Sequence, residues 1–176
     1  MTEGVYIKQE VKYLEVVSGY EVRNKYVLYR KKPGKVDKLG KPLWKAVEKS
    51  NWYSRNCCKN QCRSLKIKIQ NITKFDEDPV CLLLEKPCTC TFLCCNRPVI
   101  NVYYTEEKNG PVYLGKIYDN FDFCNFNFTV YDKNDKRLFK IHAGCCQCGT
   151  CFNRCPCKPC ETVKFTIYDR QGNSVC

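Results

Sequence analysis

Seventeen cysteines stand among the 176 residues of this chain, and their spacing decides which chemistry they can do. The densest stretch, Glu85 to Pro98, reads EKPCTCTFLCCNRP and has no histidine or acid among its cysteines. The residues between the two cysteine pairs are apolar, whereas a metal-binding knuckle usually has turn-forming residues there. Apolar residues beside thiols suit a thioester-linked acyl chain, because both enter the same interface. The acylation candidates are Cys88, Cys90, Cys94 and Cys95. The alternative is a cluster of inert thiols at a strand end.

A second cysteine-rich loop runs from Cys145 to Cys160 and contains two Cys-x-x-Cys pairs. Four thiolates with this spacing can hold zinc tetrahedrally, because each pair binds the metal from one tight turn. The five residues between the pairs are few for a zinc ribbon, so a reduced thiol cluster at the surface stays open as the alternative. The zinc candidates are Cys148, Cys151, Cys157 and Cys160.

Basic charge is concentrated in one stretch. The formal net charge of the chain is +12, and the segment from Tyr29 to Lys45 holds seven Lys or Arg residues against the single acid Asp37. An anionic membrane attracts such charge, and nucleic acid attracts it equally by counterion release. A solvated hairpin turn is the third interpretation. The candidate contacts to anionic lipid or nucleic acid are Arg30, Lys31, Lys32, Lys35, Lys38, Lys41 and Lys45.

Residue sets that perform bond chemistry are missing from the sequence. The single histidine, His142, lies in the strand-like pattern FKIHAG, where a packed or edge histidine is commoner than a catalytic base. No glycine-rich phosphate loop, Ser/His/Asp set or paired-carboxylate pattern occurs. We therefore expect that the protein is not an enzyme.

The start of the chain and the cysteine usage bear on the compartment. Lys8, Glu10 and Lys12 stand where a secretion signal would need an apolar run, and no apolar run of about 18 residues occurs anywhere. We expect a protein that is not secreted and whose thiols stay reduced. The odd number of cysteines also argues against a disulfide framework.

The elements that position these residues are short strands. Residues 5–17 are expected to form an entry strand, and polar turns separate the later β-rich runs. These runs read KYVLYR, PLWKAVE, SLKIKIQ, VCLLLE, PVINVYY, PVYLGKIY, NFNFTVY, RLFKIHA and TVKFTIY. Their two-residue period and spacing predict an all-β sandwich or barrel of antiparallel hairpins.

The same order of elements occurs twice, which predicts one domain over residues 1–176 made of two half-repeats, about 20–96 and 97–176. Each half has a hairpin, a cysteine-rich loop and a further strand. The second half reaches Cys176 just as its last strand begins, so its symmetry predicts that a C-terminal piece is missing.

Several segments, in this order, resemble the phospholipid scramblases, a family of the tubby-like β-barrel superfamily. They read YLEVVSGYEVRNKYVLY, SRNCC, LLLEKPCTCTFLCC, FNFTVYDKNDKRLFKIHAG and TVKFTIYD. The resemblance extends from about Val5 to Cys176. It implies a β-barrel around an apolar C-terminal helix, in a membrane-associated protein that moves phospholipids between leaflets in response to calcium.

The resemblance also bears on individual residues. The cluster from Cys88 to Cys95 falls on the family's palmitoylated motif, although Thr89, Phe92 and Leu93 stand where the family has further cysteines. The resemblance implies that the family's calcium-binding segment, last strand and apolar helix would lie beyond Cys176. We therefore expect calcium and covalent palmitate as cofactors of the family, with zinc as an option, and no calcium site in this chain.

These inferences combine into one expected function with two alternatives. We expect a scramblase-like protein at the cytoplasmic face of the plasma membrane, held there by acylated cysteines and basic charge, with anionic phospholipid as its partner. The first alternative is a DNA-binding regulatory module of the tubby-like type, which would have nucleic acid as its partner and the nucleus as its location. The second is a zinc-stabilised structural adaptor.

Overall fold

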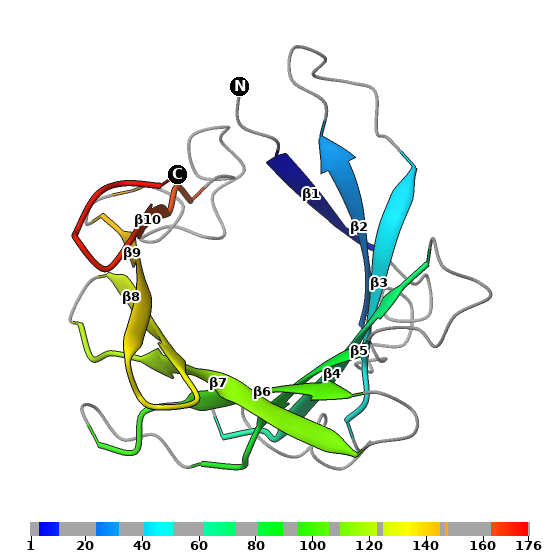
Figure 1. The fold of residues 1–176 in the computed structure, drawn as a ribbon, viewed down its shortest axis with the longest axis horizontal. Coiled ribbons are helices and arrows are strands. Elements are labelled where there is room, and N and C mark those ends of the chain that lie inside the picture. Colours follow the sequence, from blue (N-terminus) through cyan, green and yellow to red (C-terminus); the bar gives the residue numbers. More distant parts are fainter. Residues whose placement is uncertain are drawn as a thin grey trace. The chain divides into compact units, whose positions relative to one another are not determined.

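A computed structural model gives the fold (Figure 1). The structure describes residues 4–10, 24–31, 41–50, 62–72, 81–89, 95–105, 110–122, 125–144, 147 and 163–175. These residues contain ten strands and no helix. The strands are β1 (Gly4–Gln9), β2 (Lys25–Lys31), β3 (Pro42–Glu48), β4 (Leu65–Asn71), β5 (Cys81–Lys86), β6 (Val99–Thr105), β7 (Pro111–Asp119), β8 (Phe126–Asp132), β9 (Arg137–Ala143) and β10 (Thr166–Tyr168).

The strands are hydrogen-bonded in the order in which they occur along the chain, from β1 to β10, and the pairings for which registers are known are antiparallel. This confirms the predicted all-β fold of antiparallel hairpins. In the described part of the chain there is no helix of the length and hydropathy needed to cross a membrane.

The chain divides into two compact units. The first comprises Met1–Cys88 and Val102–Tyr113, and the second comprises Thr89–Asn101 and Leu114–Cys176. Because successive side chains of a strand point to opposite faces, the pairing registers define two faces for the sheet in each unit.

In the first unit, Trp44 of β3 lies opposite Leu28 of β2, and Ala46 lies opposite Ile69 of β4. This face, the apolar face, consists mainly of Val5, Ile7, Leu28, Trp44, Ile67, Ile69, Leu82 and Leu84. Ala46 is buried, whereas Val5, Ile7 and Trp44 are 64%, 60% and 41% exposed. The sheet therefore presents apolar side chains that its own unit only partly covers.

In the second unit, β8 and β9 bring Phe128 opposite Ile141 and Val130 opposite Phe139 on one face. The rings of Phe126 and Phe128 stack with centroids 6.4 Å apart. The polar residues Asn127 and Thr129 alternate with these side chains and pair with His142 and Lys140 on the other face. Each unit is thus a sheet with one apolar and one polar face.

Candidate functional site

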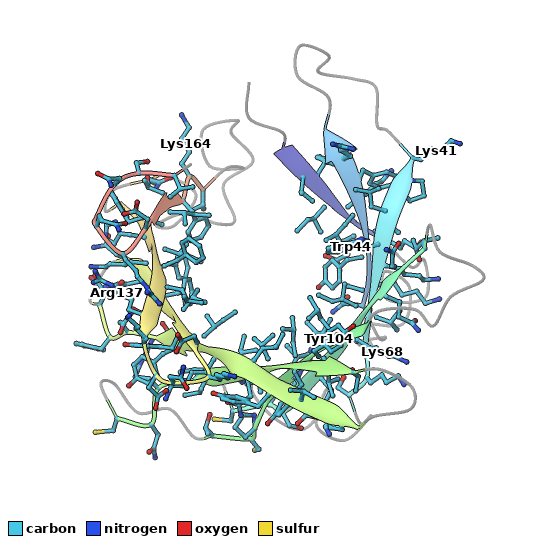
Figure 2. All side chains as sticks on the ribbon, in the orientation of Figure 1. Lys41, Trp44, Lys68, Tyr104, Arg137 and Lys164 are labelled. Atoms are coloured by element: carbon cyan, nitrogen blue, oxygen red, sulfur yellow. The ribbon has the colours of Figure 1, made fainter. Side chains whose placement is uncertain are left out.

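Five lysines from four strands gather on the second face of the sheet in the first unit. The register places Lys8 and Lys45 on either side of Val27, and Lys25 and Lys68 on either side of Val47. Lys66 lies two residues before Lys68 on β4 and therefore on the same face. Figure 2 shows Trp44 and Lys68 on opposite faces of these strands. We call Lys8, Lys25, Lys45, Lys66 and Lys68 the lysine face.

The lysine face has little acidic compensation among the described strand residues. Glu85 of β5 lies opposite Lys66, and their side chains are 2.8 Å apart. Lys45 and Lys68 lie opposite the uncharged residues Gln70 and Leu83 on the next strand. Charges on one face of a sheet can contact an anionic surface together, which is what binding to a membrane or a polyanion requires.

The predicted basic stretch is only partly described. Lys32, Lys35 and Lys38 lie outside the described residues, and for Lys31 only the backbone is described. Arg30 alternates with Leu28 and so lies on the side of the apolar face, whereas Lys45 belongs to the lysine face. Lys41 is exposed just before β3. Arg30 and Lys45, two residues of the predicted contact set, therefore lie on opposite faces of the sheet.

The two described acylation candidates, Cys88 and Cys95, are both exposed, which is the access that an acyl transfer needs. Cys90 and Cys94 lie outside the described residues. Arg97, which follows the cysteine cluster in the chain, holds this segment to the end of β7. Arg97 forms an ion pair with Asp119, and its Nε also donates a hydrogen bond to the Asp119 carbonyl over 3.4 Å. Burial raises the pKa of Asp119, and Arg97 only partly offsets this.

The thiol of Cys62, which was not predicted as an acylation candidate, lies near Cys88. Leu65 at the start of β4 pairs with Lys86 at the end of β5, so residues just before β4 meet residues just after β5. Burial lowers the pKa of Lys86, whereas the neighbouring thiols of Cys62 and Cys88 act in the opposite direction. One ammonium thus lies near both thiols.

The buried carboxylate of Glu48 connects the ends of neighbouring strands in the first unit. Glu48, only 2% exposed, accepts hydrogen bonds from Ser50, from Asn24 Nδ2 over 2.9 Å and from Arg63 Nη2 over 2.9 Å. The Arg63 carbonyl in turn accepts a 2.7 Å hydrogen bond from Lys86 Nζ. Burial alone would raise the pKa of Glu48, but the bonds from Ser50 and Asn24 and the charge of Arg63 lower it below its ordinary value. The carboxylate is therefore ionised and links strands β2 to β5.

Neither metal prediction is tested by the structure. The zinc candidates Cys148, Cys151, Cys157 and Cys160 lie outside the described residues, so zinc stays a prediction. Within the described ranges, no three His, Cys, Asp or Glu side chains come together as a metal site. The acidic side chains Asp132 and Asp169 instead accept backbone hydrogen bonds in hairpin turns, from Asn134 and Asn173 respectively, each over 2.8 Å.

The fold and these surfaces define an all-β protein with a lysine-rich sheet face and exposed thiols. Comparison with known proteins gives the family: the family model for Scramblase matches residues 1–176, and the chain belongs to this family. No solved structure matches the chain.

The chain is also similar, at low sequence identity, to curated proteins that are named phospholipid scramblases. The chain is 24% identical over 149 residues to phospholipid scramblase 1 of Homo sapiens, covering 85% of this chain and 42% of the relative. It is 26% identical over 149 residues to phospholipid scramblase 2 of Bos taurus, covering 82% of this chain and 45% of the relative. The chain thus spans less than half the length of these relatives. The resemblance predicted from the motifs is confirmed.

Proposed function

We propose that this protein acts at anionic phospholipid membranes and supports the bidirectional movement of phospholipids between the two leaflets. The observation that carries the proposal is the Scramblase family match over residues 1–176. The relatives named phospholipid scramblase 1 and 2 support it at about a quarter identity. Lipid movement is transport and forms no bond, in keeping with a sequence that lacks a catalytic set.

Attachment to the membrane is proposed to begin with the lysine face. Near an anionic leaflet, each Lys contributes roughly 1 kcal/mol of attraction, and the effect fades within a Debye length of about 10 Å. Of the five lysines, only Lys66 has a described carboxylate partner, Glu85, so most of this charge is available to lipid phosphates.

Acyl chains on the cysteine cluster are proposed to make this attachment durable. One acyl chain holds a protein to a membrane only reversibly, whereas a second chain or a basic surface makes the attachment firm. The exposure of Cys88 and Cys95 supports modification of this segment, and Cys90 and Cys94 are proposed as further positions. The cytoplasmic leaflet of the plasma membrane is the proposed location, because anionic lipids and acylated cysteines meet there.

Calcium dependence is proposed from the family resemblance alone. The described acids Asp132 and Asp169 accept bonds from their own turns and do not form a calcium site together with other acids. We therefore expect the lysine face to bind anionic vesicles without calcium, and we expect any calcium requirement to appear in lipid movement.

Reconstitution tests the proposal. The 176-residue chain is incorporated into vesicles that contain a fluorescent phospholipid in both leaflets, and a membrane-impermeant reductant quenches the outer leaflet. Protein-free vesicles lose about half of the signal because half of the lipid faces outward. Scrambling predicts a further loss in protein-containing vesicles, measured with calcium and with a chelator. Binding to vesicles without any further loss would limit this chain to membrane association.

A further inference from the structure

The second unit contains a pocket of about 310 Å³ that the membrane proposal does not use. It lies at strands β9 and β10 and the turn that follows β10. Among the residues that the structure describes, it is lined by Arg137, Lys140, His142, Tyr168, Asp169 and Gly172. We call it the β9–β10 pocket. Three of these side chains carry nitrogen donors and one carries a phenol, a combination that suits an oxyanion.

Strand register brings the donors to one face. Lys140 and His142 are two residues apart on β9 and share a face. Tyr168 of β10 lies directly opposite Lys140. Arg137 is three residues before Lys140, so in a regular strand it would point to the opposite face.

A β-bulge removes this conflict. Val130 of β8 pairs with Phe139, but the next residue, Tyr131, pairs with Arg137, which leaves Leu138 as an extra residue on β9. The extra residue returns Arg137 to the face of Lys140, because one inserted residue exchanges the two faces. Bulges commonly redirect a side chain at functional sites. Figure 2 shows the position of Arg137 on β9.

Arg137 is held in place by hydrogen bonds that leave most of its own donors available. Arg137 Nη2 donates to the Arg170 carbonyl over 3.0 Å, and Arg170 Nε donates to the Arg137 carbonyl over 2.7 Å. This bond uses one of the five N–H donors of the Arg137 guanidinium. In the part of the chain that the structure describes, the side chains of Lys140, His142 and Tyr168 form no hydrogen bond or ion pair.

The acids near the pocket are committed to their own turns. Asp169 accepts from the backbone N–H of Asn173 over 2.8 Å and from the Asn173 amide over 3.2 Å. Asp132 accepts from the backbone N–H of Lys136 over 2.9 Å and lies 3.7 Å from Arg170 Nη2. Both carboxylates stiffen the turns around the pocket, and their accepting capacity is largely filled. The side chains that remain available to a ligand in the pocket are therefore the cationic and other donor side chains.

We propose that the β9–β10 pocket binds a phosphomonoester group. Such a group is a near-dianion with three strong acceptor oxygens, and it fits a guanidinium fork, an ammonium, an imidazole N–H and a phenol together. Small-ligand sites span roughly 300–1,000 Å³, so the pocket also has room for a small group attached to the phosphate. This binding site does not depend on whether the protein moves lipids.

The phosphomonoester can come from a lipid or from solution, and two probes separate the sources. Glycerol 3-phosphate carries the group in soluble form and is titrated into the 176-residue chain by calorimetry. Phosphatidic acid carries the same group in a membrane and is tested by cosedimentation with phosphatidylcholine vesicles that contain it. Vesicles with phosphatidylserine at matched surface charge present a phosphodiester and control for the lysine face.

The variants are chosen to separate the pocket from general charge. Lys140→Gln is the main variant, and His142→Gln is the second. Lys133→Gln removes the same charge from the exposed turn between β8 and β9, outside the pocket. Lys140→Arg keeps the cation and should keep the binding. Thermal melts of each variant verify that the second unit stays folded.

We expect Lys140→Gln to weaken phosphomonoester binding about tenfold or more, because a hydrogen bond between two charged groups contributes more than one between neutral groups. Lys133→Gln should change it less than about twofold, as expected for an exposed residue. Binding of glycerol 3-phosphate supports the pocket and a soluble source, binding of phosphatidic acid vesicles alone supports the pocket and a lipid source, and binding of both shows that the pocket accepts either. Three results would each overturn the proposal. The first is an equal effect of Lys140→Gln and Lys133→Gln on phosphomonoester binding, and the second is that neither probe binds. The third is that Lys140→Gln weakens binding to phosphatidylserine vesicles as much as binding to phosphatidic acid vesicles.

Discussion

Arg63 donates from Nη2 to Glu48 Oε1 over 2.9 Å, and the side chains are 13% and 2% exposed. This ion pair lies at the end of β3 and just before β4. Its carboxylate also accepts from Ser50 and Asn24, and Gln9 donates to Asn24 Oδ1 over 2.8 Å. A buried charge with several donors is stable only while every partner stays in place. Residues from β1 to β4 therefore depend on one ionised glutamate.

Acid should weaken the first unit through Glu48. Its pKa is lowered from the ordinary value of 4.5, so the ionised carboxylate stabilises the folded state above that value. The stabilisation is lost as the pH falls through the lowered pKa. Glu48→Gln removes the buried charge that Arg63 contacts at 2.9 Å and should cost on the order of 3 kcal/mol at neutral pH. Chemical unfolding at a series of pH values measures both effects.

The matched control for this prediction is Glu85→Gln. Glu85 pairs with Lys66 over 2.8 Å, but the Lys66 side chain is 59% exposed, so the pair should contribute only about 0–1 kcal/mol. Equal losses of stability in the two variants would show that the burial of Glu48 has no energetic importance.

Acylation of the cysteine cluster should be visible in the mass of the protein. Protein purified from eukaryotic cells is expected to carry acyl-sized mass increments that hydroxylamine removes, because hydroxylamine cleaves thioesters. Replacement of Cys88, Cys90, Cys94 and Cys95 by Ala should abolish the increments and release the protein from membranes. An unmodified mass, or membrane association unchanged in the fourfold variant, would contradict the acyl anchor.

The same mass measurement under native conditions tests the second cysteine loop. A native mass that contains zinc would support this loop as a metal site.

Neutralising the lysine face should weaken membrane binding in a salt-dependent way. Lys25→Gln, Lys45→Gln and Lys68→Gln together remove about 3 kcal/mol of attraction at low salt, which is roughly a hundredfold in affinity. The difference from the unsubstituted chain should shrink at high salt, where the charges are screened. Cosedimentation with phosphatidylserine vesicles at several salt concentrations measures it.

The control for the lysine face is a variant of equal charge change in the second unit. Replacing Lys133, Lys136 and Lys164 by Gln also removes three positive charges, from exposed positions that are not part of the lysine face. This variant should bind nearly as well as the unsubstituted chain. If the two triple variants lose binding equally, net charge alone accounts for attachment. If the triple variant of the lysine face loses more affinity for duplex DNA than for vesicles, the nucleic-acid alternative is favoured.

The pairing of β7 with β8 should depend on Gly115. A Cβ at this position would lie 2.1 Å from the Tyr131 carbonyl oxygen, a backbone atom that cannot turn away. Gly115→Ala should therefore separate the two strands locally and cost on the order of 2–3 kcal/mol, as overpacked cores do. Gly144→Ala is the control, because its Cβ would meet nothing within 4 Å. Thermal unfolding of both variants checks the prediction, and similar melting temperatures would refute it.

Much of the fold was predictable because strand patterns are local. The nine β-rich runs all contain strands of the structure. The entry strand expected over residues 5–17 is confirmed in its first part, as Gly4–Gln9, and residues 11–17 lie outside the described residues. In PLWKAVE, the alternation of Trp44, Ala46 and Glu48 already placed these residues on one face. The motifs that resemble the scramblases were also readable in order along the chain, and the family match confirms them.

The strands, their turns and the family could therefore be predicted from the residues alone. Which residues share a surface could not be predicted in this way, because a face is set by the register of strand pairing, and a shift of one residue exchanges the faces. Lys8 and Lys68 are far apart in sequence and reach one face only through β2 and β3. Arg137 joins Lys140 only because Leu138 is bulged, which no local pattern specifies.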